Sequence, residues 1–110
     1  MERVYNKLVR DNIPNIIENQ GETPITRILN GEEYQKELEK KLHEEYLEVL
    51  TATKDDRVEE LADMIEVIRA LAKLENKTLE EVLTIANQKN DKRGAFTNRI
   101  FLEKVIENDK

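Results

Sequence analysis

The chain has 110 residues, of which 38% are charged and 38% hydrophobic, and its formal net charge is −6. This length predicts a single domain over residues 1–110, and many Glu, Lys, Leu and Ile residues with few Gly and Pro favour an all-α fold. The acidic balance argues against binding a nucleic-acid polymer, and with no cysteine, signal peptide or long apolar run we expect a cytoplasmic protein without membrane contact.

The N-terminal part carries weak structural patterns. Residues 1–10 alternate weakly between apolar and polar side chains, which indicates an irregular or partly extended segment. Asp11 or Asn12 can cap a short helix that Gly21 ends. Residues 23–29 contain β-branched side chains and a proline, which favours an extended connector or an edge strand.

Two long helices are expected in the middle of the chain. Asn30, with a glutamate three residues later, resembles a capping box that opens a helix over about residues 32–51. Asp55 or Asp56 would cap the next helix, over about residues 57–75. That helix is apolar nearly all round, which one short chain would struggle to cover, so we expect homo-oligomerisation through this helix.

A fourth helix and a tail complete the predicted fold. Thr78 and Glu81 form a second capping box, and the helix that follows ends at Gly94. The tail over residues 97–110 has apolar side chains that suit a short helix or a strand packed on the body. The patterns therefore predict an all-α fold of four helices, with an irregular or partly extended N-terminal segment and a C-terminal tail.

Two pairs of acidic residues lie where core residues are expected. On a helical wheel, Glu45 falls on the apolar stripe of the first long helix and Glu48 at its edge. Glu60 falls among apolar residues of the second, and Asp63 lies at the border of that face. Burying unpaired charges costs roughly several kcal/mol per ion, and hard divalent cations take oxygen ligands. The two pairs predict a Mg²⁺ site, although either pair alone could be a solvated face.

Basic residues form two further groups. Lys89 and Arg93 share a helix face and could clamp phosphate groups, although cations at a helix C-terminus are also favoured by the helix dipole. Lys7 and Arg10, with Asp11 beside them, form a weaker group that could close over the acidic site, with surface charge as the alternative. The absence of Cys and Ser, together with a single His, excludes the usual nucleophilic triads.

The order of these residues resembles the all-α nucleoside triphosphate pyrophosphohydrolases of the MazG-like superfamily. The matching side chains are, in chain order, Glu44, Glu45, Glu48, Glu60, Asp63, Asn87, Lys89 and Arg93. The opening YNKLVRDNIP and the closing KRGAF look like a small single-domain branch related to phosphoribosyl-ATP pyrophosphatase.

The resemblance implies an oligomeric four-helix-type bundle that works as a homodimer or homotetramer. It also implies roles for these side chains. It makes Glu45, Glu48, Glu60 and Asp63 the Mg²⁺ ligands. It gives Glu44 a catalytic part, either orienting the attacking water or contacting a further metal. It places the nucleotide against Asn87, Lys89 and Arg93, and the N-terminal Lys7 and Arg10 would join these substrate contacts.

The implied reaction is Mg²⁺-dependent hydrolysis of a nucleoside triphosphate or related nucleotide at the α–β phosphoanhydride, which gives a monophosphate and pyrophosphate. Two alternatives stay open. One is the phosphoribosyl-ATP pyrophosphatase of histidine biosynthesis, and the other is a non-catalytic, metal-binding helical oligomerisation module. With no Trp, two Phe and three Tyr, the sequence indicates no aromatic pocket for a particular base.

Overall fold

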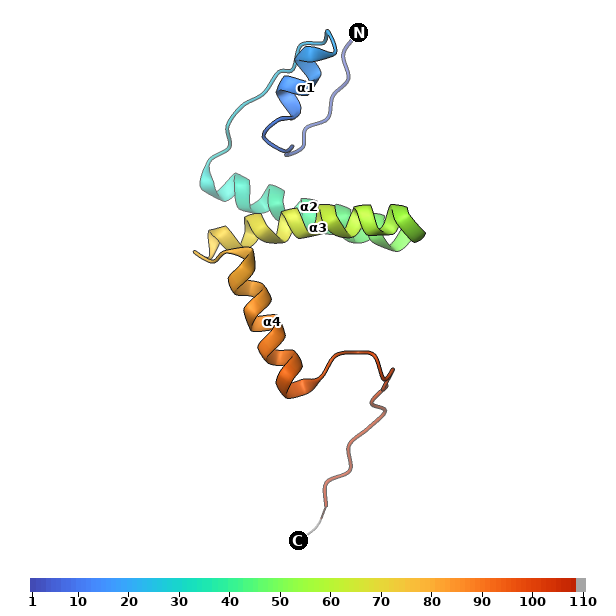
Figure 1. The fold of residues 1–110 in the computed structure, drawn as a ribbon. Coiled ribbons are helices and arrows are strands. Elements are labelled where there is room, and N and C mark those ends of the chain that lie inside the picture. The colour runs from blue at the N-terminus through green and yellow to red at the C-terminus, as the bar shows by residue number, and fades with distance from the viewer. Residues whose placement is uncertain (109–110) are drawn as a thin grey trace. The chain divides into compact units, whose positions relative to one another are not determined.

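The computed structural model describes residues 1–108, which form four helices and no strand (Figure 1). These are α1 (Ile13–Asn19), α2 (Gly31–Thr51), α3 (Lys54–Leu74) and α4 (Leu79–Arg93). The expected all-α class is confirmed. Within the described part of the chain, none of the helices combines the length and the apolar character that crossing a membrane requires.

The chain divides into two compact units. The first unit, Met1–Leu79, contains α1, α2 and α3, and the second begins at Glu80 and contains almost all of α4 and the tail. The single domain expected over residues 1–110 stays a prediction.

Helices α2 and α3 form an antiparallel hairpin, because only Ala52 and Thr53 connect them (Figure 1). Arg57 closes this turn: its Nε donates to the carbonyl oxygens of Val49 and Ala52, at 3.0 and 3.1 Å. Carbonyls in the last turn of a helix lack partners within that helix. A side chain of α3 therefore completes the end of α2 and fixes the two helices at the connection.

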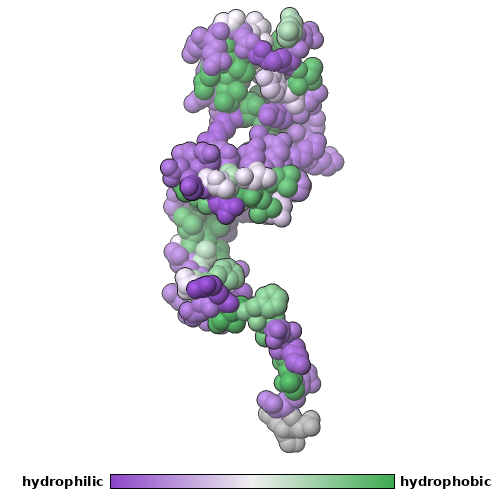
Figure 2. Space-filling model, turned by 90° about the vertical axis from the view of Figure 1, so that its right-hand side faces the viewer, coloured by the Kyte–Doolittle hydropathy of each residue, from purple (hydrophilic) through white to green (hydrophobic). Residues whose placement is uncertain are grey.

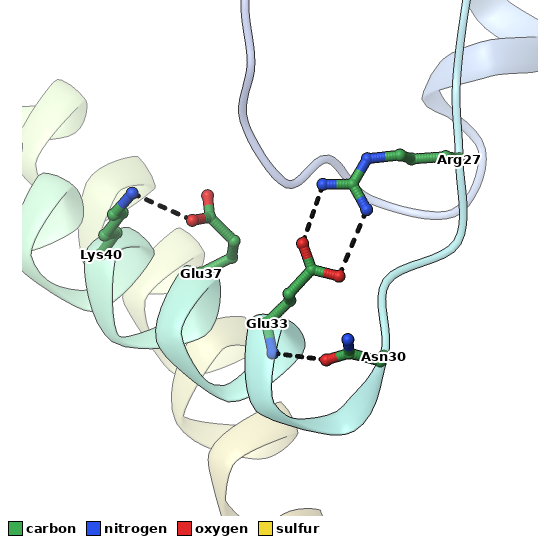
Figure 3. Close-up of polar contacts among 5 residues, drawn as sticks. All are labelled: Arg27, Asn30, Glu33, Glu37 and Lys40. Atoms are coloured by element: carbon green, nitrogen blue, oxygen red, sulfur yellow. Dashed lines mark hydrogen bonds and ion pairs between the residues drawn. The ribbon is translucent and has the colours of Figure 1, made fainter.

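The start of α2 follows the sequence prediction. The Asn30 side chain accepts a hydrogen bond from the Glu33 backbone N–H at 2.9 Å, so the predicted cap is confirmed (Figure 3). The Glu33 carboxylate accepts two hydrogen bonds from Arg27, at 2.9 and 3.3 Å, which ties the preceding connector to the helix. Residues 23–29 form neither helix nor strand, so the extended connector is confirmed and the edge strand is wrong.

The start of α3 corrects a prediction. The cap position belongs to Thr53, and Asp55 and Asp56 lie in the first turn of the helix, so neither of them is the cap. The helix begins at Lys54, whose φ of 51° lies in the left-handed region. Acidic side chains in a first turn still interact favourably with the helix dipole.

The end of α4 is as predicted, and the tail is not. Gly94 has a φ of +82°, and its N–H donates to the Asn90 carbonyl at 2.8 Å, which ends the helix. Residues 97–108 form neither helix nor strand, so both predictions for this part of the tail are wrong. The last two residues of the predicted tail lie outside the described residues.

The core of the described chain is small. Within residues 1–108, the buried hydrophobic residues are Leu38, Ala72 and Leu79. Apolar side chains of the hairpin reach the surface (Figure 2), and those at least 44% exposed include Leu47, Leu50, Val58, Leu61 and Ile65. The α2–α3 pair is therefore only thinly covered within one chain, and a four-helix-type bundle beyond this pair stays a prediction.

Candidate metal centre

Three of the predicted ligands meet between α2 and α3. Glu45 lies on α2, Glu60 and Asp63 lie on α3, and one carboxylate oxygen of each is within 4.8 Å of the others. The hairpin explains this meeting, since Glu45 is seven residues before Ala52 and Glu60 is seven residues after Thr53. Seven residues are about two turns. The two glutamates therefore lie at the same level of the antiparallel pair.

Two oxygens of this acidic group lack a partner. Oε2 of Glu45 and Oε2 of Glu60 are buried and have no hydrogen-bond partner among residues 1–108. A buried polar atom left unsatisfied costs about 1–3 kcal/mol. A proton shared between carboxylates would supply the missing partner, and so would a cation. Carboxylate oxygens from two helices, with two of them unsatisfied, fit a hard divalent cation such as Mg²⁺.

The crowding of carboxylates changes their proton affinity. Burial and then the charge of Glu48 raise the pKa of Glu45 to about 7, and Asp63 acts in the same direction. The pKa of Glu60 is also raised, first by a hydrogen bond with Glu48 and then by burial. Negative charge in the acidic group therefore costs free energy, and a bound cation would relieve this cost.

Glu48, the fourth predicted ligand, lies at the edge of the acidic group. Glu48 is exposed, whereas Glu45, Glu60 and Asp63 are half-buried. Its carboxylate is nevertheless close enough to Glu45 and Glu60 to raise the pKa of both. That Glu48 binds the metal stays a prediction.

The N-terminal basic pair divides between two places. Arg10 Nη2 donates to Asp63 Oδ1 at 2.9 Å, so this arginine reaches the acidic group of its own chain. Lys7 instead lies with its Nζ 5.7 Å from the centre of the Tyr5 ring. The sequence suggested that Arg10 could close over the acidic site and contact the substrate, but it did not identify Asp63, which is 53 positions away, as its partner.

Glu44, the predicted catalytic residue, lies outside the three-carboxylate group. Its Oε2 is 3.4 Å from the Nζ of Lys41, one turn earlier on α2. Glu44 and the exposed His43 also line an open surface pocket on this helix. The role of Glu44 in orienting water stays a prediction.

The predicted substrate contacts of α4 belong to the second unit. Asn87, Lys89 and Arg93 are all exposed on this helix, and Lys89 and Arg93 share a face by their spacing of four residues. Within residues 1–108, neither of these two cations forms an ion pair with an acid. That they converge with the acidic group stays a prediction.

Comparison with known proteins gives one partial match to report. No family model matches the chain, and no solved structure matches it. A stretch of 54 residues, 48% of this chain, is 44% identical to an uncharacterized protein of Mycolicibacterium smegmatis (strain ATCC 700084 / mc(2)155) and covers 55% of that protein. The chain thus spans about half the length of this curated relative, and the match assigns neither a family nor an activity.

Proposed function

We propose that the chain is a Mg²⁺-dependent nucleotide pyrophosphohydrolase that cleaves the α–β phosphoanhydride of a nucleoside triphosphate or related nucleotide. The observation that carries this proposal is the acidic group of Glu45, Glu60 and Asp63, whose oxygens lie within 4.8 Å of one another. Mg²⁺ commonly binds through a few carboxylates and leaves positions for phosphate oxygens. The resemblance of the sequence to the MazG-like superfamily supplies the choice of reaction.

The acidic residues have distinct parts in this proposal. Glu45, Glu60 and Asp63 would hold Mg²⁺, with Glu48 at the edge of the site. When bound, Mg²⁺ would neutralise the polyphosphate and make water a better nucleophile. The Glu44 carboxylate would accept a hydrogen bond from the attacking water and so direct it towards the α-phosphorus.

The basic residues would act on the phosphates. Arg93 offers a planar fork of donors that matches two phosphate oxygens, whereas Lys89 offers a point charge. Both would stabilise the negative charge that develops on the departing pyrophosphate. Asn87 would contact the nucleotide through its amide, and Lys7 and Arg10 would add positive charge from the N-terminal segment.

We also propose that the chain works as a cytoplasmic homodimer or homotetramer. Apolar side chains of the hairpin support this proposal, since Leu50 is 56% and Val58 is 62% exposed. Burying apolar surface contributes about 25 cal/mol per Å². A second copy packed on the hairpin would cover these side chains. Sedimentation equilibrium of the purified chain tests the proposal, and a monomer at micromolar concentration would contradict it.

Product analysis tests the reaction. The purified chain is incubated with ribo- and deoxyribonucleoside triphosphates and with phosphoribosyl-ATP, in the presence and absence of Mg²⁺. We expect pyrophosphate and the matching monophosphate, formed only with Mg²⁺. Release of free phosphate and a diphosphate would show that the cleaved bond is a different one. Cleavage of phosphoribosyl-ATP alone would favour the histidine-biosynthesis alternative.

Matched variants decide whether the acidic group is responsible. Glu60→Gln removes one carboxylate of the group, and Glu59→Gln removes the same charge from the exposed neighbouring position on α3. We expect only Glu60→Gln to abolish pyrophosphate release. Mg²⁺ binding without turnover of any nucleotide in the panel would favour the non-catalytic module.

A further inference from the structure

One cation pairs with the acidic group of the hairpin. Arg10 Nη2 donates to Asp63 Oδ1 at 2.9 Å. Within residues 1–108, this is the only ion pair that involves Glu45, Glu48, Glu60 or Asp63. Among these four carboxylates, only Asp63 therefore has a positively charged partner in the described part of the chain.

A divalent cation in this group would compete with Arg10 for Asp63. The positively charged guanidinium repels a cation, so a cation that binds Asp63 requires the Arg10 side chain to move away. The pair is exposed, at 59% for the Arg10 side chain and 46% for that of Asp63. Exposed ion pairs are weak. Breaking this pair therefore reduces the affinity for the cation by no more than about five-fold.

The position of Arg10 allows its side chain to move while its backbone stays in place. The Arg10 carbonyl accepts a hydrogen bond from the Ile13 N–H at 3.0 Å, in the turn that begins α1. Ile13 and Ile17 of this helix are half-buried, whereas Arg10 is exposed. An arginine side chain has several rotatable bonds, so it can leave Asp63 without unfolding α1.

We propose that Arg10 is a resident counter-ion of the metal site, which binds Asp63 while no divalent cation is present and releases it when Mg²⁺ binds. This inference rests on the proposed function, because it takes the acidic group as the Mg²⁺ site. The released guanidinium then lies beside the place where the substrate's phosphates arrive. The Arg10 side chain thereby partly neutralises the carboxylates when no divalent cation is bound. When Mg²⁺ is bound, the same side chain contacts the anionic substrate.

A titration of the ¹⁵N-labelled chain with MgCl₂, followed by NMR, tests this exchange of partners. Backbone amides near the acidic group report the dissociation constant, and the Arg10 Nε–Hε signal, assigned by its loss in Arg10→Gln, reports the ion pair. We expect this side-chain signal to move to the position of an unpaired arginine as Mg²⁺ saturates. We expect Arg10→Gln to bind Mg²⁺ about two- to five-fold more tightly than the unchanged chain.

Arg3→Gln is the matched control. Arg3 lies in the same N-terminal segment and forms an exposed ion pair with Glu22 at 2.6 Å, so its removal changes the net charge equally. We expect its Mg²⁺ affinity to equal that of the unchanged chain. Arg10→Lys keeps the charge, and we expect an affinity between those of the unchanged chain and Arg10→Gln.

The outcomes separate this inference from the proposed function. If the unchanged chain binds Mg²⁺ and the Arg10 signal stays in place, Arg10 is not displaced, and the inference fails while the metal site stands. Weaker Mg²⁺ binding by Arg10→Gln than by Arg3→Gln would also overturn it, because the guanidinium would then support Asp63 as a ligand. If the unchanged chain does not bind Mg²⁺, the metal site and the inference fail together.

Discussion

The acidic residues of the α2–α3 hairpin and the basic residues of α4 differ in their surroundings. Oxygens of Glu45, Glu60 and Asp63 lie within 4.8 Å of one another, and burial raises the pKa of Glu45 to about 7. Lys89 and Arg93 are exposed in the second unit. Both sets looked functional in the sequence, but only the acidic set is held together at a cost in free energy.

This difference separates two kinds of charged cluster. Charges in solvent cost little to maintain, so the basic residues of α4 are explained equally well by solubility or by favourable interaction with the helix dipole. Carboxylates that are crowded and partly buried require a compensating ligand or proton. The acidic group therefore supports the proposed function more strongly than the basic one, and four predictions test this ranking.

The largest effect is expected from removing an acidic ligand. Asp63→Asn should lower the rate of pyrophosphate release on the order of 10²- to 10³-fold, because it removes charge from the proposed Mg²⁺ site. Initial rates at saturating Mg²⁺ measure this effect. Asp56→Asn, in the exposed first turn of α3, is the control and should retain its rate. Equal rates for the two variants would show that the reaction does not require Asp63 of the acidic group.

A smaller loss is expected from the basic end of α4. Arg93→Ala should lower kcat/KM on the order of 10- to 100-fold, since it removes a forked contact to phosphate. Lys92→Ala removes the same charge from the adjacent position, which points about 100° away around the helix. Steady-state kinetics of both variants distinguish a positioned contact from general positive charge. Equal losses would reduce the role of α4 to electrostatic attraction.

The pKa of Glu45 predicts how stability depends on pH without metal. The pKa is raised from 4.5 to about 7 in the folded chain, so the folded state binds this proton more tightly than the unfolded state. Its contribution to stability is present below about pH 4.5 and is lost as the pH rises through about 7. Solvent screens this half-buried carboxylate, so the loss should be smaller than the full shift implies, at about 1–3 kcal/mol. Urea unfolding with EDTA at several pH values measures it.

Matched variants assign this pH dependence. Glu45→Gln cannot ionise, so its free energy of unfolding should change less across this pH range than that of the unchanged chain. Glu39→Gln, at an exposed position of the same helix, should keep the original dependence. A rise in stability with pH that is shared by all three proteins would contradict this prediction. It would show that ionisation of the acidic group does not destabilise the folded state.

The smallest effect is expected at the start of the hairpin. Asn30→Ala removes the side-chain cap of α2 and should lower the free energy of unfolding by about 1 kcal/mol. Gln35→Ala, at an exposed position on the same helix, is the control. Both variants keep every carboxylate of the site, so denaturant unfolding should change only for Asn30→Ala. Its turnover under native conditions should not change.

Local patterns in the sequence predicted the elements that depend on neighbouring residues. The cap at Asn30 and the end at Gly94 were found because each acts within one helical turn. The start of α3 was placed too late because acidic residues favour both the cap and the first turn of a helix, and Asp55 and Asp56 occupy the first turn. Glu45, Glu60 and Asp63, three of the four paired acids, meet as expected because a short connection fixes the register of two helices.

Contacts between distant parts of the chain were predicted only in outline: Lys7 and Arg10 were expected to close over the acidic site, without a named partner. Arg10 and Asp63 are separated by 53 positions, and no periodicity links them. The tail failed for a different reason. Its apolar residues suggested a regular element, but Ile100 and Phe101 are 85% and 87% exposed and form neither helix nor strand. Apolar composition without a clear period does not specify secondary structure.

The two-residue connection between α2 and α3 also determines when the acidic group forms during folding. Glu45, Glu60 and Asp63 fall within one stretch of chain, residues 45–63, which the Arg57 hydrogen bonds fasten at its turn. Closing a short loop costs little conformational entropy, and local contacts form quickly. The carboxylates therefore come together as soon as the two helices pair. The geometry of the proposed cation site is thus complete within the hairpin of one chain.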